Sequence, residues 1–193
     1  MLFRSATAFA NPDRNNFLNN LLLQWKKPRW EISGNVLHTY ITEKVEQGPV
    51  ASNLKKITGA IAASVQPLLL LPIRLRASFK QIFRAPTFDD LYYTNVGNTN
   101  LKPETAKLYN VGVTYNYKGE KLFTEILFSC DVYHNDVRDK ILAVPRQNLF
   151  QWSMMNIAKA SILGIDAAAQ LQTRNWYGFE MAAGFSYSYQ KAL

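Results

Sequence analysis

Apolar and polar residues alternate along most of this chain. In residues 108–117, one parity carries Tyr109, Val111, Val113, Tyr115 and Tyr117, and the other carries Leu108, Asn110, Gly112, Thr114 and Asn116. The same alternation recurs in residues 73–84, 122–135, 163–172 and 177–190, and less regularly in 29–40. A period of two is expected for a β-strand whose two faces meet different environments. The sequence therefore predicts an all-β, antiparallel fold.

The predicted strands are long, and their connections alternate in length. Strands in globular proteins most often have about 5–6 residues, whereas a strand that crosses a membrane needs about 9–11. Short connections are expected at residues 27–28, 67–71, 118–120 and 174–175, and long ones at 43–56, 85–105 and 136–160. Outer-membrane barrels have short turns on one side and long loops on the other. We therefore predict an up-and-down transmembrane β-barrel segment with eight strands and a possible ninth at residues 2–10.

Aromatic residues gather near the short connections. They are Trp25 and Trp30 at the first, Tyr115, Tyr117 and Phe123 at another, and Trp176 and Tyr177 at the last. Amphipathic rings favour a bilayer interface, so this arrangement predicts an aromatic girdle. The alternative is a soluble β-sandwich with aromatic cross-strand pairs, but its strands would be shorter and its loops less unequal.

The chain is basic, with a formal net charge of +8. Such a charge suits nucleic acid, an anionic membrane surface or an acidic ligand. A surface that binds nucleic acid would bring basic and exposed aromatic residues together. In residues 73–84, however, basic and apolar residues fall on opposite parities. Nucleic acid is therefore not a predicted partner.

Neither a catalytic motif nor a metal motif is present. The sequence has no phosphate-binding Gly-rich loop, no zinc-type cluster and no Gly-x-Ser-x-Gly elbow. His134 lies near Asp131, Asp136 and Asp139, but without the glycine and final glutamate of a calcium loop. The single cysteine, Cys130, falls on an apolar parity. We predict no enzymatic activity, no cofactor and no resident metal.

Two neighbouring runs carry a more specific signal. Residues 83–92 read FRAPTFDDLY and residues 97–105 read GNTNLKPET. Together they resemble the barrel of TonB-dependent outer-membrane receptors of the siderophore and cobalamin type. Residues 131–145, 156–158 with 164–166, and 187–190 are also similar to that family, so the resemblance covers residues 58–190.

The resemblance implies a location and a mechanism. Such receptors lie in the bacterial outer membrane, bind a scarce nutrient at the cell surface and import it with energy transmitted by TonB. It further implies that residues 1–193 form one partial barrel domain without the plug domain, and that TonB would act through that plug region. A ferric siderophore, haem or cobalamin is the implied ligand, and the lipid bilayer is the other implied partner.

We expect the ligand-binding or lumen-lining residues on the predicted strand at residues 73–84 and in the loop after it. The candidates are Arg74, Arg76, Lys80, Arg84, Asp89, Asp90, Tyr92, Tyr93, Asn98, Asn100 and Lys102. The basic residues would attract an anionic ligand, or else fill a polar lumen or pair with carboxylates of the plug domain. Two other functions remain open at this point: a passive porin or adhesin-type barrel, and a soluble polyanion-binding β protein.

Overall fold

The chain folds into a single antiparallel sheet. The computed structural model describes residues 10–119, 122–146, 151–175 and 177–193. Its eight strands are β1 (Pro12–Lys26), β2 (Trp30–Val45), β3 (Leu54–Val65), β4 (Ile73–Arg84), β5 (Glu104–Lys118), β6 (Phe123–Pro145), β7 (Trp152–Thr173) and β8 (Ala182–Ala192), with one short helix, α1 (Phe88–Tyr92). Each strand pairs with the next in sequence. This order is the up-and-down topology that the alternating pattern predicts.

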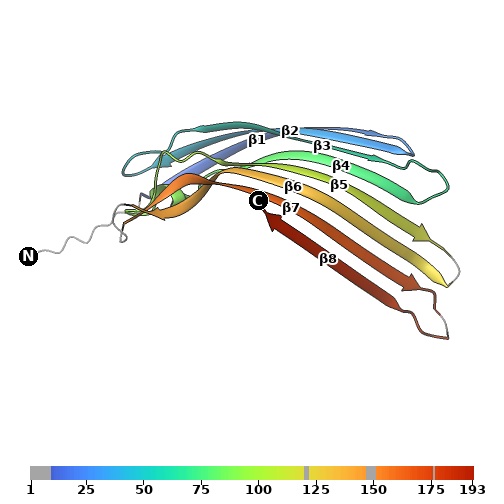
Figure 1. Ribbon diagram of the computed structural model, residues 1–193. Helices are drawn as coiled ribbons and strands as arrows, with labels where there is room; N and C mark the ends of the chain where they lie inside the picture. Colours follow the sequence, from blue (N-terminus) through green and yellow to red (C-terminus); the bar gives the residue numbers. More distant parts are fainter. Residues whose placement is uncertain (1–9, 120–121, 147–150, 176) are drawn as a thin grey trace, which may run out of the picture.

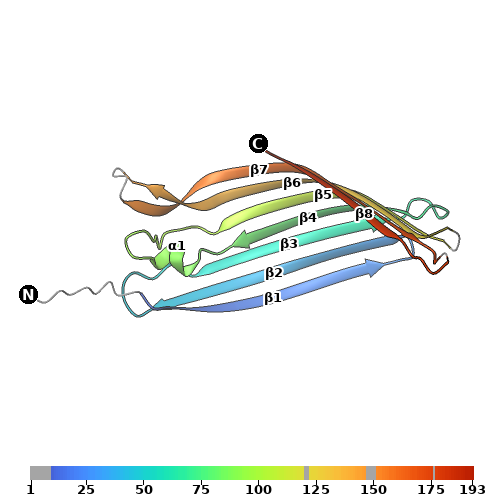
Figure 2. The same cartoon turned by 90° about the horizontal axis from the view of Figure 1, so that it is seen from below.

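The sheet curves, and its two sides differ (Figures 1 and 2). The helix α1 lies inside the curve at the end of the sheet that carries the longer connections, which we call the outer end. The opposite inner end carries the short connections between β1 and β2, β3 and β4, β5 and β6, and β7 and β8. We call the side that α1 occupies the concave face and the other side the convex face.

The register assigns each predicted parity to one face. On the concave face, β4 Arg76 pairs with β5 Gly112, which pairs with β6 Asp131. In the next row toward the inner end, Leu75, Val113 and Cys130 pair in the same way on the convex face. The predicted separation of polar from apolar residues is therefore confirmed across these central strands.

Few side chains in the described part of the chain are buried, and a small cluster of them lies at the outer end. Ala51, Leu91 and Tyr92 form this cluster, with Phe88 and Leu101 packed against it. Large apolar side chains elsewhere are exposed, among them Val111 at 64% and Phe185 at 67%. A sheet whose apolar side faces lipid needs no interior core on that side, so this burial pattern suits a membrane strand array.

The connection predicted over residues 136–160 differs in the structure. The strands β6 and β7 continue through this region and pair as far as Pro145 and Trp152. Their register shifts between Val137 and Lys140, where Asp139 has a φ of 57°. A β-bulge of this kind kinks a hairpin without ending it, so the prediction of a long loop was wrong. The outer end instead carries an extended β-hairpin.

The last strand also begins later than predicted. The connection expected at residues 174–175 runs from 174 to 181, and β8 begins at Ala182. Positive φ angles at Tyr177 (50°) and Gly178 (88°) turn the backbone here, and Asn175 Oδ1 accepts a hydrogen bond from the Gly178 amide at 3.0 Å. The alternation of apolar and polar side chains therefore begins several residues before the strand itself.

Two sequence predictions fall partly or wholly outside the described residues. The possible ninth strand was predicted at residues 2–10, of which the structure describes only Ala10, outside any strand. Trp176 of the proposed girdle also lies outside the described part. No helix within the described part is long and apolar enough to cross a membrane.

Candidate functional site

A row of basic side chains follows β4 along the concave face. Arg74 donates to Ser64 Oγ of β3 at 3.0 Å. The Arg76 guanidinium contacts both Asp131 carboxylate oxygens, at 2.9 and 3.2 Å. Lys80 is exposed, and its ammonium has no hydrogen-bond or ion-pair partner among the residues that the structure describes. The row therefore combines two arginines held by the sheet with one lysine available to a ligand.

The Arg76–Asp131 ion pair spans an intervening strand, and a glycine makes room for it. Gly112 lies between the two residues in the register. A Cβ at position 112 would lie 2.1 Å from Asp131 Oδ1 and 3.1 Å from the Cys130 carbonyl oxygen. The absence of a side chain at Gly112 thus lets Arg76 reach Asp131 across β5.

Arg84 closes the base of the loop that carries the signature sequence. Its Nε and NH2 groups donate to the two carboxylate oxygens of Glu104, at 2.9 and 2.8 Å. Its NH1 group donates to Asp90 at 3.2 Å. Glu104 also accepts a hydrogen bond from the backbone amide of Ile141 at 2.8 Å. The arginine and the glutamate of FRAP…LKPE are therefore joined to each other and to the β6–β7 hairpin.

The helix α1 begins with a capping box. Thr87 Oγ1 accepts from the Asp90 amide at 3.1 Å, and the Asp90 carboxylate accepts from the Thr87 amide at 2.8 Å. This reciprocal pair satisfies two backbone donors at the helix start. Asp90 is therefore already used by the loop itself, whereas Asp89 in the same turn is exposed.

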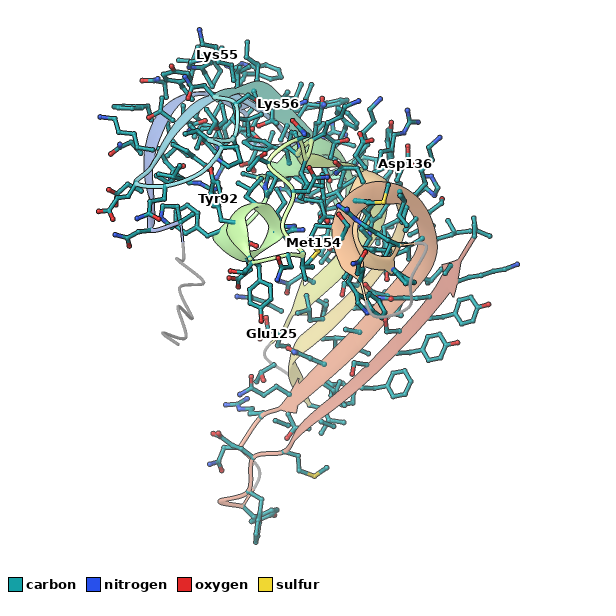
Figure 3. The ribbon with its side chains drawn as sticks, turned by 90° about the vertical axis from the view of Figure 1, so that its left-hand side faces the viewer. Lys55, Lys56, Tyr92, Glu125, Asp136 and Met154 are labelled. Carbon is teal, nitrogen blue, oxygen red and sulfur yellow. The ribbon has the colours of Figure 1, made fainter. Side chains whose placement is uncertain are left out.

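Tyr92 fastens α1 to the first strands of the sheet. Its ring is buried, with 8% exposed, and its hydroxyl donates to Glu43 of β2 and accepts from the Ala51 amide at 3.2 Å. Burial, followed by the hydrogen bond to Glu43, raises the pKa of Tyr92 above its ordinary value of 10.0. Figure 3 shows Tyr92 on α1, directed toward β1 and β2.

Arg14 of β1 completes this attachment. Its guanidinium pairs with Glu43, with Nε donating at 2.8 Å, and also donates to the Pro86 carbonyl oxygen at 2.7 Å. The same guanidinium lies 4.8 Å from the centre of the Phe88 ring, a cation–π distance. Helix and loop are thereby held against the concave side of β1 and β2.

The second half of the loop attaches to the β6–β7 hairpin. Asn98 Nδ2 donates to the Met154 carbonyl oxygen at 3.0 Å, and the Met154 amide donates to the Val96 carbonyl oxygen at 2.9 Å. The Asn156 amide group bonds both backbone groups of Lys102, at 2.8 and 2.9 Å. The loop therefore bridges the β1–β2 side of the outer end to the β6–β7 side. We call loop 85–103 and these attachments the rim clamp.

Two residues with special backbone requirements, Gly97 and Asn95, shape the rim clamp. A Cβ on Gly97 would lie 2.6 Å from the Leu91 carbonyl oxygen and 2.7 Å from the Tyr93 nitrogen. Asn95 has a left-handed φ of 66°. Residues 95–98 thus supply a left-handed turn position at Asn95, which asparagine tolerates, and a close backbone approach at Gly97.

The predicted site residues divide into two groups in the structure. Arg74, Arg76, Arg84, Asp90, Tyr92 and Asn98 bond other parts of the protein through their side chains. The side chains of Lys80, Asp89, Tyr93, Asn100 and Lys102 are exposed. The structure brings most of them to one end of the concave face, while their contact with a ligand stays a prediction.

Several residues of this region were missed from the sequence. Arg14, Glu43 and Asp131 lie far along the chain from their partners, and nothing local in the sequence marks them as partners. Gly112 could have been found from the sequence, because a glycine within a regular strand often marks a place where another group approaches the backbone closely. In contrast, no group of three or more His, Cys, Asp or Glu side chains in the described ranges is placed to hold a metal ion. His134 lies beside the Tyr109 ring, with centroids 6.2 Å apart.

Comparison with known proteins identifies similar chains. A family model described as "TonB dependent receptor-like, beta-barrel" matches residues 3–192. The vitamin B12 transporter BtuB of Vibrio vulnificus is 40% identical over 91 residues, which cover 47% of this chain and 14% of the transporter. The protein of the same name from Photobacterium profundum is 25% identical over 180 residues, covering 90% of this chain and 26% of that protein.

The fold has a solved counterpart. The copper transporter OprC superimposes with a TM-score of 0.70 at 20% identity, covering 94% of this chain and 30% of that one. At this identity the likeness concerns the fold. The chain spans about a seventh and about a quarter of the two B12 transporters that it matches.

Proposed function

The chain belongs to the TonB-dependent receptor-like β-barrel family, and from this premise we propose that it forms part of a receptor that imports a scarce nutrient with energy transmitted through TonB. Receptors of this family lie in the outer membrane of Gram-negative bacteria, so the convex face is the lipid-facing side. The observation that carries the proposal is the family match over residues 3–192. In this proposal TonB acts on a part of the receptor beyond this chain, and no catalytic role is assigned.

Cobalamin is the substrate that we propose first, before a ferric siderophore or haem. Two relatives carry the name vitamin B12 transporter, one of them 40% identical over 91 residues. The rim clamp and the basic row of β4 border the same concave space, which supports entry of a bulky polar ligand from the outer end. We assign first contact to the exposed side chains of Asp89, Tyr93, Asn100 and Lys102, and a deeper contact to Lys80.

The alternative functions account for fewer observations. A passive porin or adhesin-type barrel shares the alternation but gives no reason for the family match. A soluble polyanion-binding protein would leave large apolar side chains such as Val111 and Phe185 in water. Exposed apolar surface on that scale marks contact with a membrane or a partner.

Uptake of labelled cyanocobalamin tests the proposed function. The whole receptor of which this chain is proposed to form part would be produced in Gram-negative cells that lack their own B12 receptor. Strains with and without TonB would be compared. We expect binding in both strains and uptake only where TonB is present. Uptake that is unchanged without TonB would reject energised transport in favour of a porin, and absence of cobalamin binding would reject the substrate.

Lys80 and Lys107 provide a matched pair for locating the ligand. Both are exposed lysines of adjacent, paired strands, but Lys80 is on the concave face and Lys107 is on the convex face. We expect Lys80→Gln to weaken cobalamin binding several-fold and Lys107→Gln to leave it unchanged. Equal affinities for the two variants would remove Lys80 from the site.

A further inference from the structure

The inner end of the sheet exposes large apolar side chains in its short connections, Leu122 in one of them and several in each of two others. The β3–β4 connection contains four consecutive leucines, with Leu69 at 74% and Leu70 at 96% exposed. The β7–β8 connection exposes Phe179 at 77% and Met181 at 66%. We call Leu68–Leu71 together with Phe179 and Met181 the inner rim. Turns in water are normally rich in Gly, Pro, Asn, Asp and Ser, so this composition requires a reason.

The leucine turn is held in a defined shape by polar contacts at its base. Gln66 Nε2 donates to the carbonyl oxygens of Leu68 and Leu71, at 3.4 and 3.3 Å. Arg29 of the neighbouring connection donates to the Gln66 carbonyl oxygen at 3.1 Å and also to that of Pro67. On the other side, the Asn116 amide donates to the Pro72 carbonyl oxygen at 3.0 Å. The bonds fix the backbone while the leucine side chains remain exposed.

The leucines do not line the hollow on the concave side of this turn. That hollow is bordered by Gln66, Pro72, Ile73, Arg74, Arg76, Thr114, Asn116 and Lys118, a set without any of the four leucines. Contents of the concave space would therefore meet the polar base of the turn and not its apolar tip. The position of the leucines points to an occupant outside the barrel lumen.

The β7–β8 connection shows the same sidedness. The Thr173 amide donates to the Met181 carbonyl oxygen at 2.9 Å, so Met181 still opposes β7 and shares the convex parity of Phe185, and Phe179 lies two residues before it. Glu180 has the opposite parity and borders a concave hollow with Arg174 and Asn175. Two connections with unrelated sequences thus direct apolar groups away from the concave side.

The surroundings of the inner rim match a phospholipid leaflet. Trp25 and Trp30, on the convex face at this end, are 52% and 50% exposed and suit the interfacial zone of a bilayer. Among the described residues of the four short connections, Lys27, Arg29 and Arg174 are basic and Glu180 is the one acid. Basic groups beside an apolar insertion favour anionic lipid headgroups.

We propose that the inner rim is a lipid-insertion site, in which Leu68–Leu71, Phe179 and Met181 enter the periplasm-facing leaflet and Lys27 and Arg29 meet headgroup phosphates. The apolar surface then continues the lipid-facing band of the convex face past the ends of the strands. The site anchors the inner end of the sheet at a fixed depth. This inference rests on the outer-membrane location and is independent of which nutrient is imported.

Depth-dependent fluorescence quenching tests the insertion. The native protein would carry Cys130→Ser, one new cysteine at Leu70 or Phe179, and an environment-sensitive fluorophore, in vesicles of phosphatidylethanolamine and phosphatidylglycerol. Lys27→Cys is the matched control, because its connection lies at the same end and contains no apolar residue larger than proline. Two quenchers would be compared: aqueous iodide, and lipids with a spin label on the acyl chain, below the headgroup level assigned to Lys27.

We expect iodide quenching at positions 70 and 179 to be several-fold weaker than at position 27, and lipid quenching to be several-fold stronger. Equal iodide access at all three positions would overturn the proposal, because the inner rim would then lie in water. Protection from iodide without lipid quenching would also overturn it and would indicate a protein partner or a second copy. All three positions are exposed, so the substitutions should leave folding intact.

Discussion

The two faces of the same sheet are organised by different rules. The concave face is held by specific long-range pairs, such as Arg76 with Asp131 and Arg84 with Glu104. The convex face carries side chains such as Val111 and Phe185 that need only be apolar. A polar group that is left unpaired away from water destabilises the folded protein. An apolar side chain, in contrast, is as stable in lipid as in a protein interior. The concave face is therefore sensitive to geometry, and the convex face to polarity.

The largest effect is expected from a charge placed on the convex face. Val113→Arg should lower the free energy of unfolding by about 2–4 kcal/mol near the bilayer midplane, whereas Thr114→Arg, on the concave face, should be nearly neutral. Denaturant titration of the native protein in lipid vesicles measures both. Equal losses for the two variants would break the assignment of faces.

A smaller effect is expected from adding one methyl group to the concave face. The new Cβ in Gly112→Ala would displace the Asp131 carboxylate and break its ion pair with Arg76. Because this pair is partly exposed, with side-chain exposures of 41% and 24%, the loss should be about 1 kcal/mol.

Gly34→Ala on the convex face is the control, since its Cβ would be 3.8 Å from the nearest atom, an ordinary contact. The same denaturant titration should show little change for it. A destabilisation by Gly34→Ala as large as that by Gly112→Ala would show that geometry matters equally on both faces.

An effect of similar size concerns the rim clamp and depends on pH. Tyr92→Phe removes the hydroxyl that joins α1 to Glu43 and should cost about 0.5–1.5 kcal/mol. The folded protein holds the Tyr92 proton more tightly than the unfolded chain, because burial and Glu43 raise its pKa. The contribution is therefore complete below pH 10 and is lost as the pH rises through the raised pKa.

Proteolysis of loop 85–103 as a function of pH measures this contribution. Cleavage of the native protein should accelerate above pH 10, whereas cleavage of Tyr92→Phe should begin from a faster rate and change less. Identical pH profiles for the two proteins would exclude Tyr92 as the titrating group.

Much of the fold was predictable because a membrane strand must alternate. The parities of β4, β5 and β8 were predicted correctly, since each residue meets either lipid or lumen. The ends of the strands were predicted less well. Alternation continued through Tyr177 and Phe179, although positive φ angles at Tyr177 and Gly178 turn the chain there. In the other direction, the bulge at Asp139 interrupted the pattern while the hairpin continued to Pro145.

The candidate site was predictable in position and less so in role. Local sequence marked the loop at residues 85–103, but its charged residues bond one another and distant strands. Asp90 caps its own helix, and Arg84 bonds Glu104. Sequence indicates which residues are charged, but an ion pair between β4 and β6 depends on the register of the strand between them.

By itself the sequence determined the all-β class, the faces of the central strands, the long loop after β4, and the family signature. These properties follow from local chemistry, because period, turn residues and polarity act within a few positions. Only the tertiary structure decided that Arg14 and Glu43 hold the loop, that Gly112 admits the Arg76–Asp131 pair, and that the leucine turn avoids the lumen. Such contacts join residues that are distant in the chain, and strand register and curvature alone bring them within bonding distance.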